Sequence, residues 1–402
     1  MPTYIRCIRP QSIDPGLFTN REGEYRHTKE ILRSVILARG EEERRLMIHG
    51  DSGTGKSILL RKVLSHLKHE IDFISVIVDG KTSMNAEELL RDICENLASE
   101  LRDEYGENEK AICEISYLDE MSRVNTVTRG WARSRAKEIE TTTGAEIGIL
   151  NFFKLRMGVG SRATGTEELT GTVEIEIDSR FLRQLISHVI ETVSADRDKE
   201  VVIAIDNLDQ IHDKAQIAEF VHEIFKHRKS LLIAVLRSEA ITLEFHRSFR
   251  DPIVVGDLSG DSLKEILARR LENCPEKEIL EQKLPPIADK LRMITGNPLS
   301  FLTWVHFLCN NSELNPATML DDLKSFISNF YGFDPEEVSV ISKFFLSREN
   351  PFLKRGEIVD QSGVFEGDYD AMIENGILVP DDLYTPQKYR LSPDLAFFKL
   401  DL

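Results

Sequence analysis

The sequence has few cysteines, a shortage of positive charge and no long apolar run. Its five cysteines are scattered and form neither a CxxC pair nor a metal-ligand spacing, so we expect reduced thiols and a cytoplasmic location. No apolar segment approaches the roughly 20 residues that span a bilayer, and residues 1–10 contain no apolar signal core, so we expect no membrane partner. The formal net charge of −17 argues against polyanion binding over the whole surface but leaves room for a local basic patch.

What remains is an ordinary globular composition, with 41% hydrophobic and 30% charged residues in a chain of 402, long enough for two or three domains. Apolar runs with the length of strands alternate with amphipathic helical segments. Such runs, without polar alternation, are typical of strands buried on both faces of a parallel sheet. The predicted strands lie at 46–48, 73–78, 201–205, 231–236 and 253–255.

The first predicted strand leads directly into Gly-Asp-Ser-Gly-Thr-Gly-Lys-Ser at residues 50–57, which has the G-x-x-x-x-G-K-S spacing of a phosphate-binding loop. Glycines let the backbone N–H groups turn inward toward a phosphate, and the following helix adds its positive N-terminal end. Lys56 is predicted to reach the β- and γ-phosphates, and the Ser57 hydroxyl to hold Mg²⁺. The predicted nucleotide contacts are Gly50, Asp51, Ser52, Gly53, Thr54, Gly55, Lys56, Ser57 and Ile58.

A second set of candidates follows the predicted strand at 201–205. Asp206 stands at the carboxyl end of this strand, where ligands of parallel sheets bind, and is predicted to hold Mg²⁺ together with Ser57. Hydrolysis also needs a group that orients the attacking water, but the next residue, Asn207, cannot accept a proton. Asp209 either orients the water or caps the next helix. Nucleotide binding is therefore better supported than rapid turnover.

Three arginines are candidates for sensing or stabilising the phosphates. Arg237 ends the strand predicted at 231–236, where a guanidinium could contact the γ-phosphate, although pairing with a nearby acid explains it as well. Arg247 and Arg250 end the following helix. They could reach a neighbouring subunit's site in an oligomer, or be solvated surface charges.

Two regions lie outside this core pattern. Within 104–180, the alternating run at 172–177 predicts a half-exposed strand, which we expect to form a β-hairpin with 147–157. The hairpin is either a surface decoration or a contact for a subunit, partner or substrate. After residue 258 the pattern is helical, and three helical patterns followed by a short hairpin within about 334–402 have the layout of a winged helix.

Five segments occur in the order found in one known group of proteins: residues 18–22, 50–57, 205–209, 236–237 and the Gly-Asn-Pro-Leu at 296–299. This set resembles the AAA+-related ATPases, in particular the STAND-type and initiator-like members. The resemblance implies an α/β fold, with a doubly wound parallel-sheet P-loop NTPase core at 1–258 (insert about 104–180), a helical lid at 259–330 and a winged helix at 331–402. It also implies ATP and Mg²⁺ as cofactors.

Carried over by position, the resemblance gives Lys56 and Ser57 the phosphate and Mg²⁺ contacts, makes Asp206 the metal acid and makes Arg237 the sensor. With Asp209, which the residues alone suggest, the candidate catalytic group is Lys56, Asp206, Asp209 and Arg237. It places Pro298 against the base or sugar, and Arg21 with Glu22 beside the adenine. Asn207 departs from the many relatives that have a second acid at this position, which puts catalysis in doubt.

These residues are compatible with three classes of function. An ATP-dependent switch that forms a homo-oligomer or activates a protein partner agrees best with the core, lid and winged-helix plan. A DNA-associated ATPase resembling initiators or transposition regulators is the alternative, using its winged helix or the arginines at 123–135. However, residues 333–402 contain 14 acidic and 7 basic residues, which disfavours phosphate contacts. A metabolic kinase would leave the winged helix without a role.

Overall fold

The computed structural model describes most of the chain outside the N-terminus and the middle of the insert. The described residues are 21–38, 45–81, 84–105, 109–128, 174–197, 199–211, 230–238, 241, 249–272, 274–348, 350, 352–362, 366–381 and 388–401.

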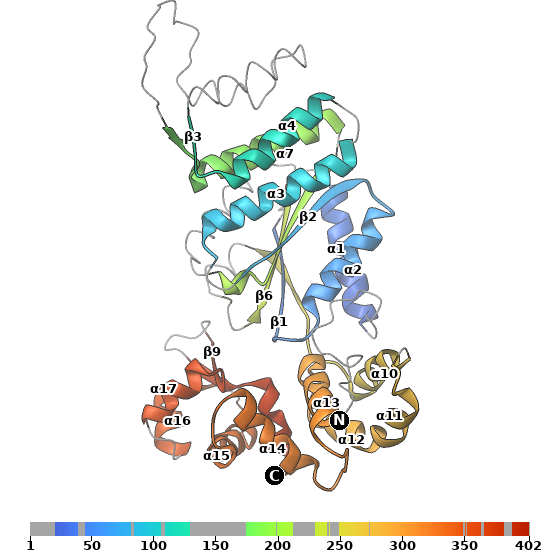
Figure 1. Cartoon of the computed structure of the whole chain (residues 1–402), viewed down its shortest axis with the longest axis vertical. Helices are drawn as coiled ribbons and strands as arrows, with labels where there is room; N and C mark the ends of the chain where they lie inside the picture. Colours follow the sequence, from blue (N-terminus) through green and yellow to red (C-terminus); the bar gives the residue numbers. More distant parts are fainter. Residues whose placement is uncertain are drawn as a thin grey trace, which may run out of the picture.

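A five-stranded parallel sheet forms the centre of the N-terminal part (Figure 1). Its strand order is β2-β5-β6-β1-β7, and every pair within it is parallel. The strands are β1 (Arg45–Gly50), β2 (Phe73–Asp79), β5 (Glu200–Asp206), β6 (Ser230–Arg237) and β7 (Arg250–Val254). The parallel sheet predicted from the five apolar runs is confirmed.

Helices cover both faces of this sheet. One face packs on α1 (Glu22–Leu37) and α2 (Lys56–Lys68), and the other on α3 (Ala86–Tyr105), α4 (Glu109–Arg123) and α7 (Ser179–Arg197) (Figure 1). Alternate residues of β5 enter different cores, because Ile203 joins the α3 side whereas Val202 and Ala204 join the α1 side. Burial on both faces is why the strand sequences are apolar without alternation.

The alternating run near residue 175 forms the short strand β4 (Glu174–Glu176), which pairs antiparallel with β3 (Thr126–Thr128). The predicted hairpin partner, 147–157, lies outside the described residues, and the pairing with β3 was not among our expectations. Alternation identifies a half-exposed strand but not its partner, which depends on chain geometry. Arg91 of α3 anchors this region by donating to the carbonyls of Ser122, Val124 and Ile177.

The C-terminal half is mainly helical and lies beyond one edge of the core (Figure 1). Its first helices are α10 (Gly260–Leu271), α11 (Lys277–Lys283), α12 (Pro285–Leu291), α13 (Pro298–Asn311) and α14 (Met319–Phe330).

The last described segment alternates helices with three short strands. It contains α15 (Pro335–Leu346), β8 (Leu353–Lys354), α16 (Arg355–Ser362), α17 (Glu366–Glu374), β9 (Leu378–Asp381), β10 (Lys388–Leu391) and the 3₁₀ segment η4 (Pro393–Asp401). The strands form an antiparallel sheet in the order β8-β10-β9. The three helices and hairpin expected here are present, and β8 is an addition too short to be recognised by periodicity.

These two helical parts share one hydrophobic cluster. Trp304 of α13 is fully buried, meets Phe397 of η4 edge-to-face with ring centroids 5.8 Å apart, and donates its Nε1–H to the Asp394 carbonyl at 2.9 Å. Helices α10 to α14 and the C-terminal elements therefore pack as one unit, because a shared close-packed core resists separation.

Cys94 and Cys309 are free and buried, whereas Cys274 is disulfide-bonded. The expectation of reduced thiols throughout is therefore wrong at Cys274. Spacing along the sequence could not reveal this bond, because a disulfide depends on two cysteines meeting in space. Among the described residues, no helix combines the length and apolar character needed to cross a bilayer.

Candidate nucleotide-binding site

The loop between β1 and α2 has the backbone shape of a phosphate cradle. Gly53 and Gly55 have φ angles of +79° and +93°, which residues with a Cβ adopt only with strain. The Lys56 amino group lies against the loop and donates to the carbonyls of Gly50 and Asp51 at 3.0 and 2.7 Å. The loop therefore holds a buried positive charge at the N-terminal end of α2, as phosphate binding requires.

The structure brings together the two predicted Mg²⁺ residues. The Ser57 hydroxyl donates to Oδ1 of Asp206 at 2.9 Å, although the residues come from α2 and β5. Asp206 is only 2% exposed, and burial raises the pKa of its carboxyl group. Arg61 adds a guanidinium nitrogen 3.9 Å from Oδ2. A hydroxyl and a carboxylate this close are oxygen ligands of the kind that Mg²⁺ prefers, so the pair fits this ion.

Asp209 and Arg237 meet each other at the same edge of the sheet. Arg237 ends β6 beside Gly50, its register partner on β1. Its Nε donates to Oδ2 of Asp209 at 2.5 Å, and its backbone N–H donates to Oδ1 at 3.2 Å. The Asp209 side chain is 2% exposed and that of Arg237 is 41% exposed. The Asp209 carboxylate therefore holds the backbone and the Nε atom of Arg237, while the rest of this side chain is partly exposed to solvent.

Arg21 lies immediately before α1 and is almost completely buried. It donates to the carbonyls of Thr54 and Gly256 at 2.5 and 2.7 Å, which joins the phosphate loop to the segment after β7. Burial lowers the pKa of its guanidinium, which Glu24 partly offsets. The exposed Glu22 lies beside it at the start of α1. An adenine contact by either residue stays a prediction.

The Gly-Asn-Pro-Leu segment meets the loop directly. Asn297 caps α13 by accepting from the N–H groups of Leu299 and Ser300, and its Nδ2 donates to the Ser52 carbonyl at 2.6 Å. A Cβ added at Gly53 would lie 2.1 Å from the Leu299 Cβ, so the lid rests against the bare glycine. Pro298 occupies the first turn of α13, and its contact with a base or sugar stays a prediction.

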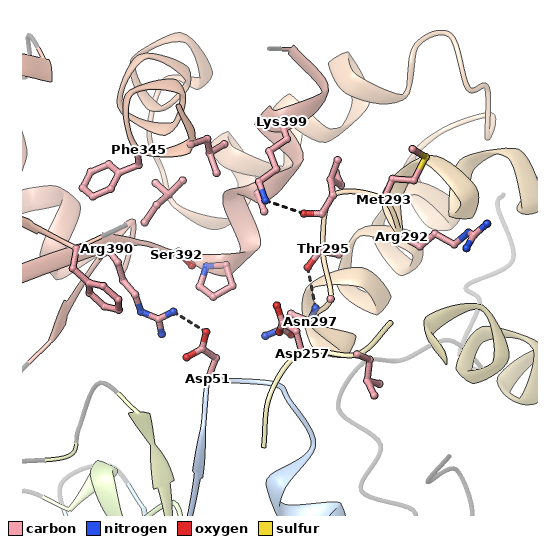
Figure 2. A pocket seen from close by; sticks show the side chains of 18 residues that line it. Asp51, Asp257, Arg292, Met293, Thr295, Asn297, Phe345, Arg390, Ser392 and Lys399 are labelled. Atoms are coloured by element: carbon pink, nitrogen blue, oxygen red, sulfur yellow. Dashed lines mark hydrogen bonds and ion pairs between the residues drawn. The ribbon is translucent and has the colours of Figure 1, made fainter. Parts of the chain in front are cut away.

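The C-terminal hairpin also reaches the loop. Arg390 of β10 forms an ion pair with Asp51 at 2.8 Å (Figure 2). This pair borders a cavity of about 600 Å³ that lies between the loop, the 292–297 segment and the C-terminal elements. Lys399 donates to the Ile294 carbonyl at 3.4 Å on the same cavity wall (Figure 2). Charged groups from distant parts of the chain therefore converge on the outer side of the loop.

Of the remaining predicted residues, Ile58 is fully described and Arg250 only in its backbone, whereas Arg247 is not among the described residues. Ile58 lies in the first turn of α2 and is partly buried. Arg250 opens β7, but its side chain is outside the description, and Arg247 lies outside the described residues. Their role toward a neighbouring subunit stays a prediction.

Residues 18–233, more than half of the 402-residue chain, match the family model described as AAA ATPase domain. The chain belongs to this family. The match begins before α1 and ends within β6, so the phosphate loop, Asp206 and Asp209 all lie within the matched AAA ATPase region.

Solved structures of similar proteins align over nearly the whole chain. Cdc6p from Pyrobaculum aerophilum is 12% identical, with 98% of this chain and 98% of that chain covered and a TM-score of 0.44. Drosophila ORC bound to DNA is 12% identical, with coverages of 98% and 90% and a TM-score of 0.46. Aeropyrum pernix ORC1 in complex with DNA is 14% identical, with coverages of 100% and 97% and a TM-score of 0.43. No curated protein matches the chain.

Three residues of this AAA ATPase site were not among the sequence candidates. Asn297 lay in a recognised segment without a role of its own, and Arg390 was counted only among the basic residues of 333–402. Asp79 ends β2 as Asp206 ends β5, and the two are register partners. An aspartate directly after a buried strand was the signal for Asp206, and the same signal was present at Asp79.

Proposed function

We propose that the protein is an ATP-binding and ATP-hydrolysing switch whose nucleotide state controls its assembly or its action on a partner. Lys56 and the loop N–H groups bind the phosphates, Ser57 and Asp206 hold Mg²⁺, and Arg237 senses the γ-phosphate. Membership of the AAA ATPase domain family and the Ser57–Asp206 contact support this assignment. The finer placement among STAND-type proteins is part of the same proposal and rests on residues 296–299.

The observation that carries the switch is the distribution of contacts along the loop. Four consecutive residues, 51–54, are held by three separate parts of the chain: the hairpin, the start of α13 and the residue before α1. The Asp51 side chain pairs with Arg390, the Ser52 carbonyl accepts from Asn297, Gly53 lies against Leu299, and the Thr54 carbonyl accepts from Arg21. A phosphate that adjusts this loop therefore acts on the lid, the C-terminal hairpin and the start of α1 together.

Such contacts allow nucleotide to select between arrangements of the C-terminal half. A ligand shifts a conformational equilibrium only by its difference in affinity for the two states. ATP and ADP differ in the γ-phosphate, which Arg237 at the end of β6 would detect in this proposal. The lid and C-terminal elements share one hydrophobic cluster, so they would respond to this difference as one unit.

The DNA-associated alternative, with a winged helix at 331–402 as the reader of DNA, has weaker support. The side chain of Arg390, one of the basic residues of the hairpin, is 12% exposed and paired with Asp51. Arg123 is paired with Glu95 and Asp119, and the other arginines of 123–135 lie outside the described residues. Residues 333–402 are also acidic in sum. These observations favour the switch.

Mass photometry tests the proposal directly. The purified protein is measured with Mg²⁺–ADP and with a non-hydrolysable Mg²⁺–ATP analogue, each with and without duplex DNA. We expect assembly with the ATP analogue alone, and none in Lys56→Ala, which lacks the phosphate-binding amine. Assembly that requires DNA would instead support the DNA-associated alternative. Identical mass distributions with both nucleotides under every condition would contradict nucleotide-controlled assembly.

A further inference from the structure

The edge of the sheet that holds Asp206 carries a second carboxylate on the neighbouring strand. Asp79 is the last residue of β2 and lies opposite Asp206 in the parallel register. Asp206 is buried, whereas Asp79 is exposed at the strand end. Asp79 is therefore an accessible carboxylate beside the proposed metal ligand.

Asn207 holds this carboxylate in place. Its backbone has a φ of +54°, a left-handed conformation that asparagine tolerates better than most residues with a side chain. Its Nδ2 donates to Oδ1 of Asp79 at 2.6 Å. Asn207, which stands where a second acidic residue was expected after Asp206, thus forms a hydrogen bond to the acidic residue at the end of β2.

Gly80 maintains the close approach that this contact needs. Its N–H donates to the Asp206 carbonyl at 2.7 Å, which extends the ladder between β2 and β5 by one residue. A Cβ at position 80 would lie 2.5 Å from the Asn207 carbonyl oxygen. The backbone therefore keeps Asp79, Asp206 and Asn207 in one fixed group.

Three other described carboxylates near the phosphate loop, those of Asp206, Asp209 and Asp51, have partners. Asp206 is bonded to Ser57 and fits the metal role. Both oxygens of Asp209 accept from Arg237, and that side chain is buried. Asp51 is turned to the outer side of the loop, where it pairs with Arg390 (Figure 2). Asp79 has one oxygen positioned by Asn207 and lies exposed at the edge where strands β2 and β5 end.

We infer that Asp79 is the catalytic carboxylate that orients the attacking water, with Asn207 as its positioning residue. The inference rests on the proposed ATP hydrolysis. In that reaction the water oxygen forms a bond to the γ-phosphorus, while the bond from that phosphorus to the β–γ bridging oxygen breaks and leaves its electron pair on ADP. Asp79 accepts the proton lost by the water and passes it to the released phosphate or to solvent.

The two side chains therefore stand in exchanged positions: the carboxylate expected directly after Asp206 on β5 is on β2. The amide follows the metal aspartate on β5, and the carboxylate comes from β2. A reciprocal exchange of the two groups should keep one amide and one carboxylate in contact at the same edge. Asparagine and aspartate have nearly the same shape and both tolerate the left-handed backbone at position 207.

The test combines ATP binding with single-turnover hydrolysis of γ-labelled Mg²⁺–ATP at excess protein. We expect Asp79→Asn to lower the turnover rate by about 100-fold or more, as is typical for loss of a catalytic base, while its ATP affinity stays within about threefold of wild type. Asp72→Asn is the matched control, because Asp72 is exposed just before the other end of β2. The double variant Asp79→Asn/Asn207→Asp should regain a large part of the lost rate.

Three other outcomes overturn the inference, and a fourth refutes the proposed function. Turnover by Asp79→Asn within threefold of Asp72→Asn would show that this carboxylate is not needed. A loss in Asp79→Asn that the double variant does not recover would indicate a structural role. Binding of ATP by the wild type without turnover would also overturn it and leave nucleotide binding intact. Failure of the wild type to bind ATP at all would instead refute the proposed function, and the separate binding measurement distinguishes these results.

Discussion

The guanidinium of Arg390 lies 2.8 Å from the carboxylate of Asp51, so the C-terminal hairpin is ion-paired to the phosphate loop. Arg390 is 12% exposed and Asp51 is 36% exposed, which places the pair between the surface and the interior. It is also continuous with the Asn297–Ser52 hydrogen bond on the next loop residue. The two contacts tie the hairpin and the lid to adjacent positions of one loop.

Asp51→Asn should loosen this attachment. A partly exposed ion pair contributes about 1 kcal/mol, which corresponds to a roughly fivefold change in an opening equilibrium. We therefore expect amide hydrogen exchange at 388–391 to accelerate roughly fivefold in the nucleotide-free protein. Lys354→Ala removes an exposed charge from the same small sheet without touching the loop. Equal exchange in these two variants would show that the ion pair does not hold the hairpin.

Gly53→Ala should prevent the lid from docking. The residue has a φ of +79°, and an added Cβ would meet the Cβ of Leu299 at 2.1 Å. The backbone strain alone costs about 1–2 kcal/mol, and the collision with the lid adds to it. We expect the free energy of unfolding to fall by more than that amount. Gly256→Ala is the control, because nothing lies within 4 Å of its added Cβ. Equal thermal midpoints for both variants would contradict the docking contact.

Asp209 and Arg237 should behave as one unit. The buried Asp209 carboxylate accepts hydrogen bonds from both the side chain and the backbone of Arg237. Removing this carboxylate therefore leaves the Arg237 side chain without the contacts that orient it. We expect Asp209→Ala and Arg237→Ala each to lower the preference for ATP over ADP by about 5- to 20-fold, roughly 1–2 kcal/mol for a charge-assisted contact. The double variant should be no worse than either single one. Additive losses in the affinity ratio would instead mean that Asp209 acts independently.

Asp394 should make stability depend on pH. Burial raises the pKa of this carboxyl group above its ordinary value of 3.8, and Ser300 partly offsets the shift by donating to it. Because the folded state has the higher pKa, ionisation destabilises folding above that pKa, and the effect disappears as the pH falls to about 3.8. The free energy of unfolding of the wild type should therefore rise relative to that of Asp394→Asn as the pH falls from 7 to 4. Denaturant unfolding of both proteins checks this, and a constant difference across the range would contradict it.

Much of the core was predictable because its signals are local. The apolar runs marked all five strands of the sheet, since strands buried on both faces exclude polar residues. Residues 50–57 marked the loop, since a phosphate cradle needs glycine at fixed positions. Asp206 was identified because it follows a buried strand, and its contact with Ser57 agrees with that reasoning.

Pairings between distant residues could not be predicted in the same way. The partner of β4, the disulfide state of Cys274 and the bonding of Asp209 to Arg237 all depend on where separate segments meet. Periodicity records which face of an element is buried, but it contains no information on which other element covers it. The sequence offered two roles for Asp209, and the structure shows its contact with Arg237.

By itself, the sequence determined the parallel sheet, the phosphate loop and the position of Asp206, because burial and backbone conformation restrict the residue types allowed at each place. The tertiary structure alone decided that Asp51, Ser52, Gly53 and Thr54 meet Arg390, Asn297, Leu299 and Arg21, and that Asn207 binds Asp79. These contacts join residues up to 339 positions apart. They arise from how the sheet, lid and hairpin pack together, which no short segment of the chain specifies.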